Sequence, residues 1–136
     1  MTYLLDTNAC IALINGRPEK VRQRLERALS NEDDTATSSV ALFELWYGVS
    51  KTGRPDANAV RLSTFLAGPI DRFDFDEEDA REAGAIRAQL EAIGRPIGAY
   101  DLLIAGQARR RGATLVTANV AEFDHVAELR CEDWAS

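Results

Sequence analysis

The first eight residues constrain the fold of this chain more than any other stretch. Three apolar residues, Tyr3-Leu4-Leu5, run directly into Asp6-Thr7-Asn8. A short apolar run without polar alternation is typical of a strand buried on both faces. Asp and Thr then favour the start of a helix. We therefore expect Asp6 at the carboxyl end of a central strand, where open α/β sheets form their ligand-binding crevice.

Helical and strand patterns alternate along the rest of the chain. Helices are predicted from Thr7 to before Gly16, from Arg17-Pro18 onward, from Val40 through Tyr47 and beyond, from after a break at residues 53–55 to about Ala67, from Asp76 to Ile93, and from Ala99 to about Arg111. The second has Val21, Leu25, Ala28 and Leu29 on one face, and the fifth has Ala83, Ile86, Leu90 and Ile93 on one face. Strands are predicted at residues 35–38, 70–75, 113–117 and near 129–131, with a short helical turn at 120–123. This alternation predicts a three-layer α/β/α domain around a mostly parallel sheet of four or five strands.

Length and composition limit the functional classes. The 136 residues suit one domain spanning residues 1–136, and no apolar run approaches the ~20 residues that cross a membrane. The N-terminus lacks the pattern of a signal peptide, so we expect a cytoplasmic protein with its two cysteines reduced. The net charge of −6 argues against a broad basic surface for nucleic acid. It does not exclude a nuclease, because acids that hold metal ions also count as negative.

Two acids lie among unusually many apolar neighbours. Glu44 stands within Ala41-Leu42-Phe43-Glu44-Leu45-Trp46-Tyr47, and Asp101 is the single acid of residues 97–105. Burying an unpaired carboxylate costs several kcal/mol or shifts its pKa, so such acids require an explanation. A structural explanation exists for each: Glu44 on a narrow solvated stripe, and Asp101 stabilised by the dipole of a helix N-terminus.

A polar cluster follows the strand predicted at residues 113–117. Thr117, Asn119 and Glu122 should lie over the same edge of the sheet as Asp6. The alternative is a polar turn in which Asn tolerates a left-handed backbone. If the acids converge, each pair of carboxylates repels by roughly 3 kcal/mol at ~5 Å. Raised pKa values or a divalent cation relieve this repulsion, and oxygen ligands without Cys or His favour Mg²⁺ or Mn²⁺.

Several motifs in this order resemble the PIN-domain ribonucleases, and among them the VapC toxins of bacterial type II toxin–antitoxin pairs. The resemblance covers essentially the whole chain. It rests on residues 4–8 (LLDTN), 43–48 (FELWYG), 96–105 (PIGAYDLLIA), 115–119 (LVTAN) with Glu122-Phe123, and the closing Trp134.

The resemblance implies a Mg²⁺-dependent endoribonuclease in which Asp6, Glu44 and Asp101 match the family's three acids. Many PIN domains carry a fourth acid where this chain has Asn119, with Glu122 three residues on. That departure leaves open whether Glu122 binds metal directly, through water or not at all, and whether one or two metals bind. The positions of Thr7, Asn8 and Thr117 match side chains that support the acids. In-line attack by a metal-activated water would leave 5′-phosphate and 3′-hydroxyl ends.

The resemblance also implies partners. These are an RNA substrate, with tRNA as one candidate, a second toxin chain, and a VapB-like antitoxin that blocks the acid site. Trp46 and Tyr47 either pack in the core or line a groove that takes an antitoxin helix. Arg95, Arg109-Arg110-Arg111 and the basic residues of the second helix (Arg17, Lys20, Arg22, Arg24, Arg27) are candidate RNA contacts, although solvated or helix-end charges explain them equally well. We expect His125 at the surface and the acids between Asp74 and Glu82 in a structural role.

Other classes fit the residues less well. A receiver-like signalling module needs a phosphoacceptor Asp after a mid-chain strand and a late Lys, but the only lysines are Lys20 and Lys51. A catalytically silent binding module is disfavoured by three intact acids, and a metal titration would separate it from the enzyme. A Rossmann domain is excluded because no GxGxxG follows the first strand.

Overall fold

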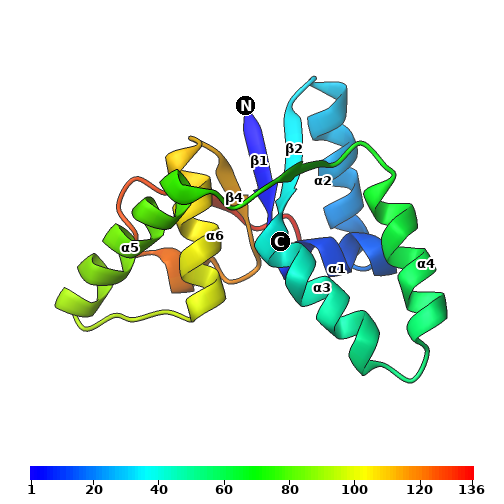
Figure 1. The fold of residues 1–136 in the computed structure, drawn as a ribbon. Coiled ribbons are helices and arrows are strands. Elements are labelled where there is room, and N and C mark those ends of the chain that lie inside the picture. The colour runs from blue at the N-terminus through cyan, green and yellow to red at the C-terminus, as the bar shows by residue number, and fades with distance from the viewer.

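A five-stranded parallel sheet carries the fold (Figure 1). The computed structural model describes every residue from Met1 to Ser136. Its strands are β1 (Thr2–Leu5), β2 (Asp34–Ser38), β3 (Asp71–Phe73), β4 (Thr114–Val116) and β5 (Cys131–Glu132), in the spatial order β3-β2-β1-β4-β5. All neighbouring strands are parallel. The central β1 is covered on both faces, and Leu4 and Leu5 are fully buried, as its unbroken apolar run predicted.

Helices cover both faces of this sheet, which confirms the predicted α/β/α layers (Figure 1). The helices are α1 (Thr7–Asn15), α2 (Glu19–Ser30), α3 (Ser39–Lys51), α4 (Pro55–Leu66), α5 (Glu77–Ala92) and α6 (Ala99–Arg110), with the 3-10 helix η1 (Val120–Phe123). Leu4 packs in a core with α5 and α6, whereas Leu5 packs in a second core with α1, α2 and α4. Helix α3 contributes Ala41 to the first core and Leu45 to the second.

Side-chain caps fix where the helices begin. Asp6 caps α1, Ser38 caps α3, and Asp76 forms a reciprocal capping box with Asp79 at the start of α5. Each cap satisfies backbone N–H groups that the helix itself cannot. The cap at Asp6 also places the first acid where β1 ends.

The element boundaries differ from the prediction at a few points. Helix α2 begins after Pro18 rather than at Arg17, and β3 spans only Asp71–Phe73. Ile93 was placed on the buried face of α5, but the helix ends at Ala92 and Ile93 is exposed. The left-handed backbone of Gly94 (φ 71°) turns the chain away at this point.

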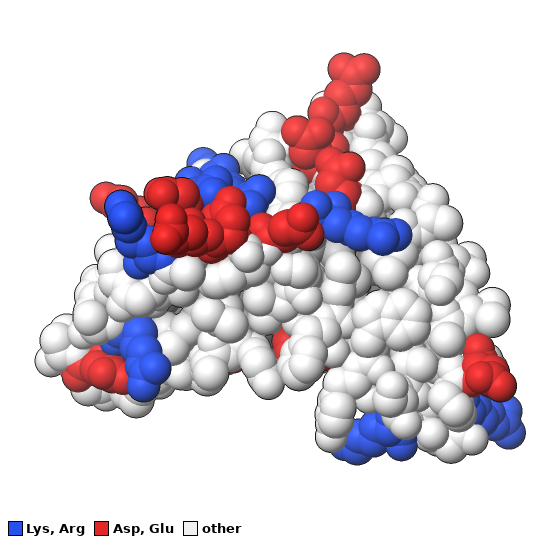
Figure 2. Space-filling view, viewed as in Figure 1, with Lys and Arg blue, Asp and Glu red and all other residues white.

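The acidic run between Asp74 and Glu82 has a structural role, as expected. Asp79 is fully buried, and it forms ion pairs with Arg110 and Arg111. Arg109 pairs with Glu82 at 2.6 Å. These pairs join α5 to the end of α6, and they engage all three consecutive arginines within the protein. In Figure 2 charged side chains gather along the upper edge of the face, and much of the rest is uncharged.

No helix is long and apolar enough to cross a membrane. Both cysteines are free thiols; Cys10 is buried and Cys131 is half-buried.

Candidate active site

Asp6 lies at the carboxyl end of β1 and is held there by its neighbours. Its side chain is 8% exposed. The carboxylate accepts a hydrogen bond from the Ala9 amide at 2.8 Å, and the Thr117 hydroxyl also hydrogen bonds to it. Burial raises the pKa of Asp6, and these hydrogen bonds lower it in part. The structure thus brings Thr117, at the end of β4, to the acid that ends β1.

Glu44 is joined to the same edge of the sheet by a hydrogen bond from the first residue of α1. It lies on the second turn of α3 and is half-buried. The Thr7 hydroxyl donates to its Oε1 at 2.6 Å. Glu44 is therefore a bonded acid facing the sheet edge and not one on a freely solvated stripe. Its charge contributes to raising the pKa of Asp6, which places the two carboxylates near each other.

Asp101, in the first turn of α6, completes the cluster with Glu122 of η1. Burial, followed by the charge and hydrogen bond of Glu122, raises the pKa of Asp101 to about 6. Asp6 and Glu44 add smaller contributions in the same direction. Four carboxylates from β1, α3, α6 and η1 thus interact at one edge of the sheet.

The residue facing Asp101 is Glu122, and Asn119 has a different part. The Asn119 side chain is exposed, while its backbone N–H donates to Thr117 Oγ1 at 3.0 Å. Its carbonyl accepts from the Glu122 amide at 3.0 Å. Asn119 therefore shapes the turn that presents Glu122, and it fixes the hydroxyl that contacts Asp6.

The donors at this edge fit a hard divalent cation in kind. They are carboxylate and hydroxyl oxygens, with no thiol or imidazole among them. No three Asp, Glu, His or Cys side chains are gathered tightly enough in this structure to enclose an ion. Burial and the neighbouring carboxylates raise the pKa values of Asp6 and Asp101, and a cation bound among these acids would relieve their mutual repulsion.

Comparison with known proteins identifies the family. The PIN domain model matches residues 3–129. The chain is 42% identical over 135 residues to the tRNA(fMet)-specific endonuclease VapC of Shigella flexneri, covering 99% of each chain. It is 40% identical over 134 residues to the ribonuclease VapC2 of Rickettsia felis, covering 98% of each. This chain belongs to the VapC ribonucleases of the PIN-domain family.

Solved structures agree with this assignment and confirm the predicted fold. The PIN domain superposes on the structure of VapBC2 from Rickettsia felis bound to a promoter DNA fragment with a TM-score of 0.90 and 39% identity, covering 97% of this chain and 98% of that one. DNA-bound VapBC from Salmonella typhimurium gives a TM-score of 0.90 at 38% identity, with 98% of each chain covered.

The PIN domain exposes two aromatic residues for which core packing was one of the two predicted alternatives. Trp46 is 42% exposed and Tyr47 is 60% exposed, so the core-packing interpretation is wrong. Both lie on the outer side of α3, where Phe43 is also exposed and contacts Tyr100 of α6 with ring centroids 5.6 Å apart. Helix α3 is apolar nearly all round, so its pattern could not tell its outer face from its inner one.

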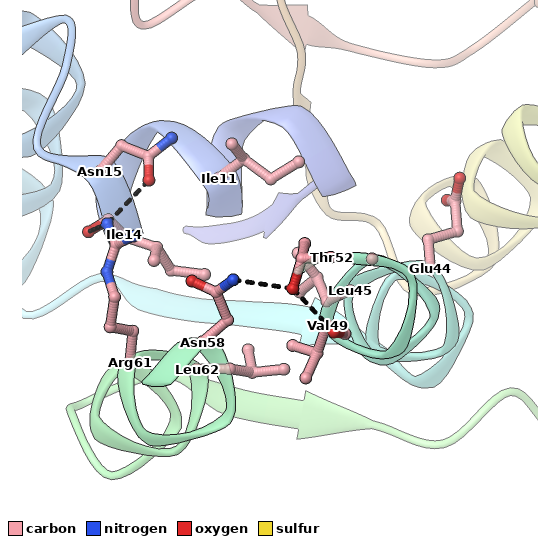
Figure 3. A pocket seen from close by; sticks show the side chains of 11 residues that line it. Ile11, Ile14, Asn15, Glu44, Leu45, Val49, Thr52, Asn58, Arg61 and Leu62 are labelled. Carbon is pink, nitrogen blue, oxygen red and sulfur yellow. Dashed lines mark hydrogen bonds between the residues drawn. The ribbon is translucent and has the colours of Figure 1, made fainter. Parts of the chain in front are cut away.

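A groove of about 240 Å³ lies between α1, α3 and α4 (Figure 3). Apolar side chains from all three helices line it: Ile11, Ile14, Leu45, Val49 and Leu62. Glu44 lies at one end of the groove. Arg61 and Asn58 add polar groups, bonded to Asn15 and Thr52. Trp46 and Tyr47 are not among the lining residues. Sequence reasoning missed this groove, although Ile11 and Ile14 at helical spacing were a signal for it.

The remaining candidates for RNA contact are exposed, except Arg24, which is half-buried and bonded within the protein. Arg95 is exposed in the loop before α6, and His125 is exposed beyond η1, as expected. Arg24 of α2 pairs with Glu132 at 2.7 Å. Arg17, Lys20, Arg22 and Arg27 are exposed on α2 and the loop before it.

Proposed function

We propose that this PIN domain is a Mg²⁺-dependent endoribonuclease and the toxin of a toxin–antitoxin pair, inhibiting growth by cleaving RNA. The observation that carries the proposal is the convergence of Asp6, Glu44, Asp101 and Glu122 at the sheet edge. Its VapC relatives are named ribonucleases. Two are named as specific for tRNA(fMet), which makes tRNA the first substrate to test.

In this proposal Asp6, Asp101 and Glu44 hold the ion, and Mn²⁺ can replace Mg²⁺. When bound, such an ion neutralises charge on the scissile phosphate and lowers the pKa of water. The protein orients the acids beforehand: the Ala9 amide and Thr117 fix Asp6, and Thr7 fixes Glu44.

Glu122 is placed for proton transfer in this scheme. Its carboxylate lies beside Asp101, at the edge where the acids would hold the ion. A carboxylate there accepts a proton from the attacking water as the water oxygen bonds to phosphorus. The P–O3′ bond then breaks, and the leaving O3′ takes a proton from solvent water, which gives a 5′-phosphate and a 3′-hydroxyl.

We further propose that the groove between α1, α3 and α4 takes an amphipathic helix of a VapB-like antitoxin. Its walls are apolar and one end reaches Glu44, so a peptide lying there approaches the acid site (Figure 3). The exposed aromatic face of α3, with Phe43, Trp46 and Tyr47, is the surface we assign to a second toxin chain. The solved relatives are VapBC complexes, some bound to DNA.

An RNA-cleavage assay tests the proposed activity. Antitoxin-free protein is incubated with total RNA and Mg²⁺ or Mn²⁺, and fragments are mapped by sequencing their ends. We expect discrete fragments that disappear with EDTA or with Asp6→Asn, while Asp56→Asn, an exposed acid on α4, cleaves as the wild type does. Cleavage that survives Asp6→Asn would reject the site. Folded wild-type protein that cleaves no RNA, tRNA included, would reject the activity.

A further inference from the structure

A second cleft, of about 150 Å³, opens beside the acid site between α1 and the C-terminal tail. Ala9 and Ala12 of α1 form one wall, and the chain around Trp134 forms the opposite wall. Asn8 and Thr117 also line it. Thr117 hydrogen bonds to Asp6, so the cleft and the acid site share a wall.

The floor of this cleft is apolar and rigidly held. Val116 and Trp134 are buried there. Trp134 Nε1 donates to Glu132, whose carboxylate also binds Arg24, and the indole packs edge-on against Tyr3 with centroids 5.2 Å apart. The rim is open, because Asn8 and Ala118 are exposed. A space well below the ~300 Å³ of drug-sized sites suits one flat ring.

Charge decides which part of a nucleic acid such a cleft can accept. The chain carries a net charge of −6, and the four carboxylates of the acid site lie beside the cleft. A phosphate is repelled there unless cations intervene, whereas an uncharged base can enter an apolar cleft without that cost. The side-chain amide of Asn8 offers a hydrogen-bond donor and an acceptor at the rim. A donor and an acceptor side by side can pair with the edge of a base.

Cations available for the flanking phosphates lie at the far rim. Pro18 lines the cleft, and its neighbours Arg17, Lys20 and Arg22 are exposed. Glu19 is the one acid among these neighbours of Pro18, so this side of the cleft is net positive. By contrast, Arg109, Arg110 and Arg111 at the end of α6 form ion pairs with acids at the start of α5. Asp133 lines the cleft beside Trp134, and its carboxylate accepts hydrogen bonds from the Ala135 amide and the Ser136 hydroxyl.

We propose that this cleft binds one nucleobase of the RNA next to the scissile phosphate, with Asn8 reading its edge and Arg17 and Lys20 contacting a neighbouring phosphate. The inference rests on the proposed ribonuclease function and adds to it the site that selects the nucleotide beside the cut.

RNAs that each lack a single base test the cleft. A short RNA spanning a mapped cleavage site is made intact and as a set with one base removed at each position. With wild-type protein we expect kcat/KM to fall about tenfold when the base on one side of the cut is missing. The Ala118→Leu substitution fills the cleft from its exposed rim. With intact RNA, its kcat/KM should be about tenfold below that of the wild type. Removing the same base from the RNA should then lower the kcat/KM of this variant little further. Ala80→Leu, exposed on α5, is the matched control and should behave as the wild type.

Binding without cleavage separates this inference from the proposed activity. In a Glu44→Gln background, the Kd for the same RNAs is measured by fluorescence anisotropy. Arg17→Glu with Lys20→Glu should weaken all RNAs alike and reduce the salt dependence, and the exposed Arg81→Glu should not. Failure of wild-type protein to cleave rejects the activity, and the binding data still decide the cleft. Equal affinity for intact and abasic RNAs overturns the inference, as does an Ala118→Leu protein that binds RNA normally but no longer binds its antitoxin.

Discussion

Asp101 is the acid whose ionisation is most affected by its neighbours. Its pKa of about 6 lies above the usual 3.8, chiefly because of burial and then Glu122. The folded protein therefore binds this proton more tightly than the unfolded chain does. Its contribution to stability is fully present below about pH 4 and is lost as the pH rises through about 6. The acids thus reduce the stability of the metal-free protein at neutral pH.

We therefore predict that Asp101→Asn stabilises the metal-free protein at pH 8. The gain is on the order of 1 kcal/mol, after allowance for solvent screening, because the variant removes a repelled charge. At pH 4 the difference should largely vanish. Thermal melts in EDTA at both pH values measure this, with Glu26→Gln, an exposed acid on α2, as the control. A variant that gains nothing at pH 8 would contradict the repulsion among the four acids.

The roles of Glu122 and Asn119 can be separated by substitution. Glu122 hydrogen bonds to Asp101 through its side chain, whereas Asn119 contacts Thr117 through its backbone amide. We predict that Glu122→Gln lowers kcat at least tenfold, since a positioned proton acceptor contributes ~10²–10⁴. Asn119→Ala keeps the amide and should cost less than threefold. Single-turnover cleavage of a mapped RNA measures both, and a larger loss in Asn119→Ala would assign the fourth position to Asn119 itself.

Divalent ions should also stabilise the fold through these residues. A ligand at 100 times its Kd adds about 2.7 kcal/mol of stability. We predict that Mg²⁺ raises the Tm of the wild type by several degrees and leaves Asp6→Asn nearly unchanged. Calorimetry with a Mg²⁺ series and an EDTA blank measures this. An equal rise in both proteins would indicate ion binding elsewhere.

The sequence predicted the acids far better than their surroundings. Asp6, Glu44 and Asp101 were recognisable because each interrupts an apolar segment, and the end of β1 and the start of α6 are both strong local signals. The ion pairs of Arg111 with Asp79 were not predictable, since the partners lie 32 residues apart and meet only when α5 packs on α6.

At the level of elements, the contact between α5 and α6 depends on one glycine. A Cβ at Gly106 would lie 2.6 Å from the Ala83 backbone, whereas a Cβ at Gly84 meets nothing within 4 Å. We predict that Gly106→Ala destabilises the protein by about 1–3 kcal/mol through overpacking. Gly84→Ala, the matched change within α5, should stabilise it by about 0.5–1 kcal/mol. Urea unfolding measures both, and a stable Gly106→Ala protein would show that the two helices can move apart freely.

The type of an element was predictable where its sequence pattern was long. The boundaries of an element were not predictable where the backbone conformation of a single residue decides them. The apolar period of α5 and the unbroken run of β1 were sufficient. The strand predicted near 129–131 is the two-residue β5 (Cys131–Glu132), whose bounds and place at the sheet edge follow from pairing with β4. The sequence placed the end of β1 and the polar residues after β4 at one edge of the sheet, while the clefts beside them depend on the three-dimensional packing of α1.

For the whole molecule, the two surfaces that we propose for protein and for RNA use different residues of α1. The groove shared with α3 and α4 reaches Glu44, and the cleft beside the C-terminal tail reaches Thr117. An inhibitor that occupies the first groove can therefore approach the acids without filling the second. This separation makes variants possible that lose inhibition and keep catalysis.

Gly48→Leu is the variant we expect to do this. Gly48 lines the groove on α3, and a Cβ there meets no other atom, so a leucine projects into the groove without disturbing the fold. We predict at least a tenfold higher Kd for the cognate antitoxin by isothermal titration calorimetry, unchanged RNA cleavage, and toxicity that co-expressed antitoxin no longer suppresses. Gly84→Leu, at an equally open glycine on α5, controls for the change in helix propensity. If the antitoxin neutralises Gly48→Leu as readily as the wild type, it binds the toxin elsewhere, and the exposed aromatic face of α3 becomes the surface to test next.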